Sequence, residues 1–241
     1  MATQLTIVNN ILRRLREETV ATVNESAYST LIAMFVNDAK EDMEDMGHLW
    51  STYRTTIDTS ILNDGTTQYD LTGTNERSFL LRRFEQPTLP MAIDITSGEP
   101  GQLWEIPYSE LLAVRNLDTN PTQTDTTPRN FSVYPTSTGF GMELLWGSSE
   151  SRTWRTWWYV PQDPLDVSGG TDDATLVQLP RRPVELRALY YALEERGEVM
   201  GPRSGSNAWM RSENAIASAI EIDQQVNKDW QEKIFTNEEN L

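Results

Sequence analysis

Apolar residues recur every three or four positions over two segments near the start of the chain, which predicts two amphipathic helices. The first extends from a cap at Thr3 to Arg16, and the second from a cap at Ser26 to about Gly47, with Trp50 just beyond it. Because the connection between them is short and polar, we expect the two helices to pack antiparallel. Their apolar stripes consist of Leu5, Val8, Ile11, Leu12 and Leu15, and of Tyr28, Leu31, Ile32, Phe35, Ala39, Met43 and Met46.

After Trp50 the apolar period changes from 3.6 to 2, and β-branched and aromatic residues become frequent, which predicts strands. The turn Asn63-Asp64-Gly65 predicts a β-hairpin between residues 53–61 and 68–71. The loop 147–151 predicts a second hairpin, between residues 142–146 and 154–160. We also expect strands at 79–84, 91–95, 131–134 and 174–179, a short helix at 109–116 and an exposed polar loop at 120–130.

The helical period returns after Pro183 and predicts one helix up to Arg196 and a last helix from about Ala208 to Trp230. Because helices occupy both ends of the chain and strands its middle, we expect an α+β fold without a parallel βαβ sheet. Residues 1–50 and 181–241 would form a helical bundle, and residues 51–180 an inserted, antiparallel β-rich lobe.

Charge and composition narrow the possible functions. The net charge of −16 and the pI of about 4.4 argue against binding nucleic acid by neutralising phosphates. The absence of cysteine excludes disulfides, thiol catalysis and cysteine zinc sites. The sequence contains no secretory signal and no apolar run of the roughly 20 residues that span a bilayer. We therefore expect a protein made and used without export and without a membrane.

The second predicted helix carries an acidic face formed by Asp38, Glu41, Asp42 and Asp45. Like charges four positions apart destabilise an isolated helix by about 0.2–0.5 kcal/mol per pair. Two uses would account for such a face: a wall that meets the arginines of a neighbouring subunit, or a wall that faces passing DNA. The sequence alone does not choose between them.

Candidate catalytic chemistry is sparse. His48 is the only histidine, and it is either a lone base beside Glu44 or, as we favour, a polar residue at a helix end. Asp38, Asp42 and Asp45 share a helical face, but one helix supplies too few oxygen ligands for a cation. There is no nucleophile elbow and no phosphate-binding glycine loop. We therefore predict no enzyme activity and no catalytic, metal or cofactor site.

Two groups of aromatic residues are candidate interaction sites. The strand with Trp154, Trp157, Trp158 and Tyr159 is either a sugar-binding platform or, as we favour, a strand covered by the core on one face and by another lobe or subunit on the other. The polar tail 230–241 is either frayed or a docking peptide that orders on a partner. Its apolar residues are Trp230, Ile234, Phe235 and Leu241.

The segments around the predicted helices also carry spaced motifs. Near the start these are Leu5-x-x-Val8-Asn9-x-Ile11-Leu12-x-x-Leu15-Arg16-Glu17, then Tyr28, Leu31-Ile32 and Phe35-Val36-Asn37-Asp38-Ala39-Lys40. Further on they are Tyr53-Arg54-Thr55-Thr56-Ile57, Tyr69-Asp70-Leu71, and Leu179-Pro180 before a helix with Ala188, Ala192 and Glu195-Arg196. The motifs resemble head-to-tail adaptor proteins of short-tailed bacteriophages, of the tail tubular protein A type, most clearly over residues 1–80 and 179–197.

The resemblance implies a non-catalytic structural protein of the virion, assembled in the host cytoplasm. Such adaptors form a ring, here expected to be a dodecamer, between the portal protein and the tail nozzle or a tail tubular protein B-like partner. The ring extends the channel for DNA ejection, and double-stranded DNA passes through it without specific binding. Acidic walls suit this role because they repel phosphate. A glycan-binding β-module of a phage tail is the alternative.

Overall fold

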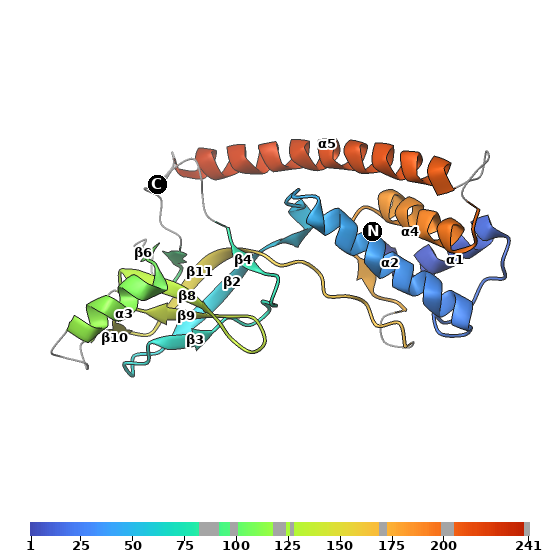
Figure 1. Cartoon of the computed structure of the whole chain (residues 1–241). Helices are drawn as coiled ribbons and strands as arrows, with labels where there is room; N and C mark the ends of the chain where they lie inside the picture. The colour runs from blue at the N-terminus through green and yellow to red at the C-terminus, as the bar shows by residue number, and fades with distance from the viewer. Residues whose placement is uncertain are drawn as a thin grey trace. The chain divides into compact units, whose positions relative to one another are not determined.

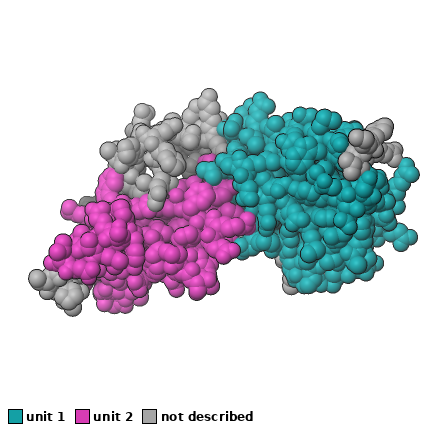
Figure 2. Space-filling model, viewed as in Figure 1, with its two compact units in different colours: residues 1–53, 162–241 teal, residues 54–161 magenta. Residues whose placement is uncertain are grey.

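The computed structural model describes residues 1–81, 92–96, 101–117, 124–125, 128–168, 173–198 and 205–238, with side chains up to residue 225 apart from Asp125. The chain divides into two compact units, one built from residues 1–53 and 162–241 and the other from residues 54–161 (Figure 2). The first unit holds four long helices, and the second holds a large sheet with one helix (Figure 1). The protein is thus a mixed α and β structure. None of the helices among the described residues combines the length and the apolar character that a transmembrane span requires.

Helix α4 is the centre of the first unit, because it contacts α1, α2 and α5 (Figure 1). A short antiparallel strand pair, β1 with β12, lies beside these helices. The elements of this unit are β1 (Ala2–Thr3), α1 (Gln4–Leu15), α2 (Ala27–Asp45), the 3₁₀ helix η1 (Ser51–Tyr53), β12 (Leu176–Val177), α4 (Arg181–Glu195) and α5 (Gly205–Glu238).

Local sequence explains where the first two helices begin and end. The Thr3 hydroxyl accepts a hydrogen bond from the Thr6 N–H at 3.2 Å, and Ser26 forms a capping box with Ser29. Helix α1 stops at Arg16, whose φ of 63° is left-handed. The predicted starts of both helices, at Thr3 and Ser26, are confirmed.

The buried stripe of α2 differs from the predicted one. Tyr28, Leu31 and Phe35 are only half-buried, and Met46 is exposed. The residues that α2 buries are Ser29, Ile32, Ala33, Val36, Ala39, Lys40 and Met43. The stripe includes Lys40 because its ammonium group pairs with Glu44 at 3.2 Å inside the unit.

Residues 162–180 belong to the helical unit, although the sequence analysis placed them in the β-rich lobe. One side chain of α2 accounts for much of this attachment. The Asn37 amide donates to the Leu165 carbonyl at 2.8 Å, and its oxygen accepts from the Leu165 N–H at 3.0 Å. Because this contact joins residues 128 positions apart, no local pattern could predict it.

The second unit is built on an eight-stranded sheet with the order β2-β11-β5-β6-β8-β9-β3, with β4 paired to β11. A separate two-stranded sheet joins β7 to β10, and α3 contacts β8. The strands are β2 (Arg54–Ile61), β3 (Gln68–Asp70), β4 (Phe79–Leu80), β5 (Ala92–Asp94), β6 (Gln102–Glu105), β7 (Thr124–Asp125), β8 (Asn130–Pro135), β9 (Phe140–Leu144), β10 (Gly147–Ser148) and β11 (Arg152–Tyr159), and the helix is α3 (Tyr108–Leu117).

Both predicted hairpins are wrong in their pairing, although their strands exist. β2 pairs along its whole length with β11, while β3 pairs with β9. The two predictions rested on turn residues, which are local signals. Strand pairing depends instead on which large side chains the sheet buries. Register places Trp154 opposite Thr59 and Trp158 opposite Thr55, and both tryptophans enter the core.

The prediction of a sheet without parallel βαβ connections is also wrong. β6 and β8 are parallel neighbours, and α3 lies in the connection between them. β7 and β10 form a second parallel pair, so the predicted polar loop contributes a strand. Of that loop, residues 120–123 and 126–127 lie outside the described residues, as do residues 82–84 and Met91 of the predicted strands.

A buried ion pair joins β5 to β11. The Arg152 Nη1 donates to Asp94 Oδ2 at 2.6 Å, and the Thr96 N–H donates to Asp94 Oδ1 at 2.8 Å. Burial by itself raises the pKa of Asp94, but these hydrogen bonds favour its charged form and hold its pKa below the usual value. Asp94 therefore stabilises the fold above the carboxyl's unfolded pKa, and this contribution is lost as pH falls through the lower folded pKa.

We expect Asp94→Asn to reduce the free energy of unfolding by about 1–3 kcal/mol at pH 7, with the difference disappearing well below pH 4. Urea unfolding at several pH values, followed by tryptophan fluorescence, measures this difference. Asp58→Asn is the matched control, because Asp58 pairs with Arg155 across the same sheet but is 40% exposed. The control should lose about 1 kcal/mol at most. Equal losses of unfolding free energy in the two variants would contradict the assignment of Asp94 as a buried, stabilising partner of Arg152.

Candidate functional site

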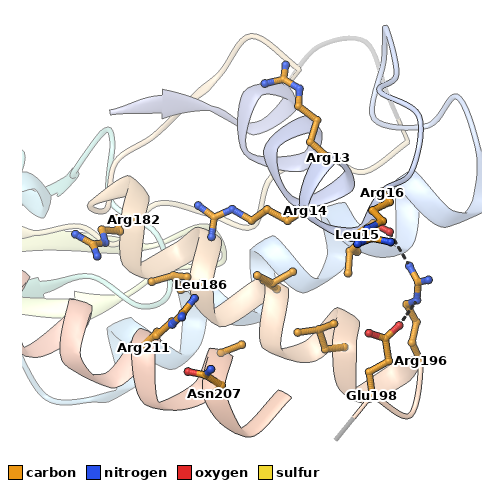
Figure 3. A pocket seen from close by; sticks show the side chains of 13 residues that line it. Arg13, Arg14, Leu15, Arg16, Arg182, Leu186, Arg196, Glu198, Asn207 and Arg211 are labelled. Carbon is orange, nitrogen blue, oxygen red and sulfur yellow. Dashed lines mark hydrogen bonds and ion pairs between the residues drawn. The ribbon is translucent and has the colours of Figure 1, made fainter. Parts of the chain in front are cut away.

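A cleft lined by arginine lies within the helical unit, between the end of α1, one face of α4 and the start of α5 (Figure 3). Its volume is about 1080 Å³. Six arginines and a single carboxylate line it, together with an apolar floor of leucine and alanine. The lining residues are Arg13, Arg14, Leu15, Arg16, Arg182, Leu186, Leu189, Leu193, Arg196, Glu198, Asn207, Ala208 and Arg211.

Helical spacing places the cleft residues of α4 on one face. They follow one another at intervals of three or four positions: Arg182, Leu186, Leu189, Leu193 and Arg196. The face turned to α2 is different, because Tyr191 contacts Phe35 and donates to Asp42. Leu189 and Leu193 are each two positions from Tyr191, which places them on nearly the opposite side of the helix.

A buried carboxylate holds the α1 side of the cleft. Glu185 is 3% exposed and accepts hydrogen bonds from Asn10 at 2.7 Å, Arg14 at 3.4 Å and Arg181 at 2.5 Å. These contacts tie the last turns of α1 to the first turn of α4. Arg14 is thereby fixed while 44% of its side chain stays exposed.

The positive charges of the other cleft arginines are balanced by few carboxylates. Arg196 pairs with Glu17 and Glu198, each at 3.1 Å, and donates to the Leu15 carbonyl at 3.4 Å. Among the described residues no ion pair involves the remaining four, which are exposed: Arg13, Arg16, Arg182 and Arg211. The cleft therefore keeps an excess of positive charge on a chain of net charge −16.

This combination determines what the cleft can bind. A guanidinium group binds carboxylate or phosphate oxygens through paired N–H donors. Leucine side chains, in contrast, gain free energy by covering apolar atoms. Arginine is enriched at protein interfaces for these reasons. The cleft is suited to a protein surface that presents acidic and apolar side chains together.

The acidic face predicted on α2 is mostly open. Asp38, Glu41 and Asp45 are exposed. Asp42 instead accepts from the Tyr191 hydroxyl and lies 3.9 Å from Arg187 Nε, so it joins α2 to α4. The pKa of Asp38 is raised, because nearby atoms partly desolvate its carboxyl and because Glu41 and Asp42 repel its charge.

The structure confirms that the core covers one face of the aromatic strand β11, and it corrects the wider interface predicted for this strand. Trp154 and Trp158 are fully buried in the core of the second unit, so they cannot form a subunit interface or a sugar platform. Tyr159 is also buried and stacks on Phe79 with ring centroids 5.0 Å apart. Trp157 is half-buried and is the one member of the group with substantial exposure. An aromatic sugar platform needs several open ring faces, and this strand does not present them.

His48 forms a structural contact with a residue that the sequence analysis did not consider. His48 Nε2 lies 2.8 Å from Asp223 Oδ2, and the Ser51 N–H also donates to this oxygen, at 3.1 Å. The Ser51 hydroxyl donates to Asp223 as well, so the carboxylate separates the serine from the histidine. A nucleophilic serine needs the histidine at its own oxygen. The cluster ties α5 to the segment after α2. Glu44, which the sequence analysis considered as the neighbour of His48, forms an ion pair with Lys40 instead.

The predicted docking tail continues a helix. α5 runs to Glu238 rather than ending near Trp230, so the backbones of Ile234 and Phe235 are helical. The side chains of Trp230, Ile234 and Phe235 and the whole of Leu241 lie outside the described residues. Their predicted role in docking therefore stays a prediction.

The arginine cleft is the feature that sequence reasoning missed. Arg13, Arg14 and Arg16 lie in the last turns of the first predicted helix, where the helix dipole also favours cations, so their position alone does not indicate a binding site. Arg182 and Arg196 lie on one face of the later helix, which was a second signal. In the described part of the chain, no group of three or more His, Asp or Glu residues is arranged to hold a metal ion.

Comparison with models of known protein families finds no match for this chain, and no curated protein sequence matches it either. What the protein does is therefore inferred from its own residues, and from the arginine-lined cleft above all.

Proposed function

We propose that the protein is a structural head-to-tail adaptor of a short-tailed phage virion, which forms a ring between the portal and the tail nozzle. The observation that carries this proposal is the arginine-lined cleft of the helical unit on an acidic chain. A wide cleft with cationic walls and an apolar floor favours contact with another protein surface. Ring adaptors depend on such contacts, both between subunits and with the partners above and below.

The motifs that resemble phage adaptors support the proposal by their position. Val8, Ile11 and Leu12 of the first motif are buried in the core of the helical unit. The motif around Ala188 and Ala192 supplies buried residues of α4, which contacts α1 directly. The resembling segments at the two ends of the chain thus meet in one packed unit, whereas Tyr69-Asp70-Leu71 belongs to the second unit. We interpret this unit as a helical bundle domain and the second unit as its inserted β-rich lobe.

The acidity of the chain agrees with passage of DNA through such a ring. Carboxylates repel phosphate, so an acidic wall lets double-stranded DNA slide without binding specifically. We expect the ring to be a dodecamer located in the virion and assembled in the host cytoplasm. Its partners would be the portal protein and the tail nozzle or a tail tubular protein B-like protein, with residues 230–241 available for docking.

Sedimentation velocity of the protein mixed with its portal tests this function. We expect a complex much larger than either component, even where the free protein sediments as a monomer. A matched mixture with serum albumin in place of the portal controls for nonspecific association. Independent sedimentation of the protein and its portal would contradict the proposal.

A further inference from the structure

We propose that an acidic stripe on α2 of one copy of this chain docks into the arginine-lined cleft of the next copy. The stripe is formed by Met34, Asp38, Glu41 and Asp45, and it meets the cleft in a head-to-tail contact between subunits. This inference rests on the proposed ring and assigns the two surfaces that join its subunits.

The stripe is a continuous exposed surface. Its members follow one another at intervals of four, three and four positions along α2, which places them on one side of the helix. All of them are exposed, including Met34 at 49%. The residues that α2 buries lie on the opposite side. The stripe therefore offers carboxylates and an apolar side chain together, which is the combination that the cleft accommodates.

The two surfaces agree in length. From Met34 to Asp45 the helix rises about 16.5 Å, at 1.5 Å per residue. From Arg182 to Arg196 the face of α4 that lines the cleft extends about 21 Å. A helix face of the first length fits along the second, and an amphipathic helix in a groove is a common mode of recognition.

Their placement prevents one copy from joining its own two surfaces. α4 contacts α2 through Tyr191 and Arg187, while Leu189, two positions from each, lines the cleft on nearly the opposite side. Because the stripe and the cleft lie on different faces, the stripe of one copy and the cleft of the next form a heterologous contact. Such contacts generate closed rings when the rotation between copies closes.

Charge complementarity identifies the occupant. Asp38, Glu41 and Asp45 repel one another on a bare helix. Partial desolvation raises the pKa of Asp38, and repulsion from Glu41 and Asp42 raises it further. Arg182 and Arg211 have no ion pair within the described residues. Docking would reduce the repulsion among the stripe carboxylates and would supply ion-pair partners to these arginines. A nucleic acid is disfavoured in the same cleft for two reasons. The net charge of −16 repels it, and the leucine floor offers phosphate groups no hydrogen-bond donors.

Cysteine crosslinking tests the contact directly, since the chain contains no cysteine of its own. Glu41→Cys and Arg211→Cys chains with different tags are mixed, with and without the portal, and treated with a short bis-maleimide. We expect dimers that contain both tags, with a yield several-fold above that of a control pair in which Glu221→Cys replaces the stripe cysteine. Asp45→Cys with Arg182→Cys provides an independent second pair.

Charge reversal supplies the second arm. In the Glu41→Cys and Arg211→Cys pair, adding Asp38→Lys and Asp45→Lys to the stripe chain, or Arg182→Glu to the cleft chain, should abolish the crosslink, and mixing the two reversed chains should restore it. Arg129→Glu, at an exposed arginine outside the cleft, should leave the yield unchanged. Yields equal to the Glu221→Cys control, with the portal present, would overturn the proposal. If the protein still assembles on the portal in that case, the adaptor function stands and only the assigned surfaces are wrong.

Discussion

Replacing Trp158 by alanine should lower the free energy of unfolding of the second unit by about 3–5 kcal/mol. The ring of Trp158 is fully buried in the core, 5.7 Å between centroids from Phe140. Its indole N–H donates to the Thr156 hydroxyl at 2.8 Å, so alanine would also remove this hydrogen bond. Denaturant unfolding followed by circular dichroism measures the loss.

Trp157→Ala is the matched control, because Trp157 directly precedes Trp158 on the same strand and is only half-buried. We expect a clearly smaller loss from it. Equal losses from the two variants would contradict the assigned faces of β11. The pair also separates core packing from sugar binding, since a binding platform would tolerate Trp158→Ala without loss of stability.

Replacing Lys40 by alanine should destabilise the helical unit by about 3–5 kcal/mol, because one partner of a buried ion pair would remain without its countercharge. The side chains of Lys40 and Glu44 are 0% and 5% exposed. Lys40 also donates to the Gln162 carbonyl, and Glu44 accepts from the Tyr53 hydroxyl at 2.5 Å. The pair thus holds three segments of the unit together.

The double variant Lys40→Met with Glu44→Gln should recover much of this loss, because it removes both charges and keeps similar volumes. Glu41→Gln, one position along α2 and exposed, should change stability little. Thermal unfolding of the three variants provides the comparison. A double variant as unstable as Lys40→Ala would show that the loss arises from packing rather than from the stranded carboxylate.

Local signals predicted the elements of this fold well. The spacing of Val8, Ile11 and Leu12 identified α1, and the caps Thr3 and Ser26 marked the helix starts, because these signals depend on residues only a few positions apart. Strand pairing depends on distant residues, and there the predictions failed. Nothing near the turn Asn63-Asp64-Gly65 indicates that β2 would pair with β11.

The candidate site was only partly predictable for the same reason. The acidic residues of α2 share a single helix, so helical periodicity was enough to group them. The cleft takes Arg14, Arg182 and Arg211 from three helices, and only their packing brings these arginines together. The contact between His48 and Asp223 spans 175 residues, which places it beyond any sequence pattern.

Electron microscopy of the protein bound to its portal tests the central claim most directly. The adaptor account predicts a closed ring on the portal, in which the stripe of Asp38, Glu41 and Asp45 from each subunit lies in the arginine-lined cleft of its neighbour. Images in which the protein is absent from the portal, or bound to it as separate single copies, would contradict the account.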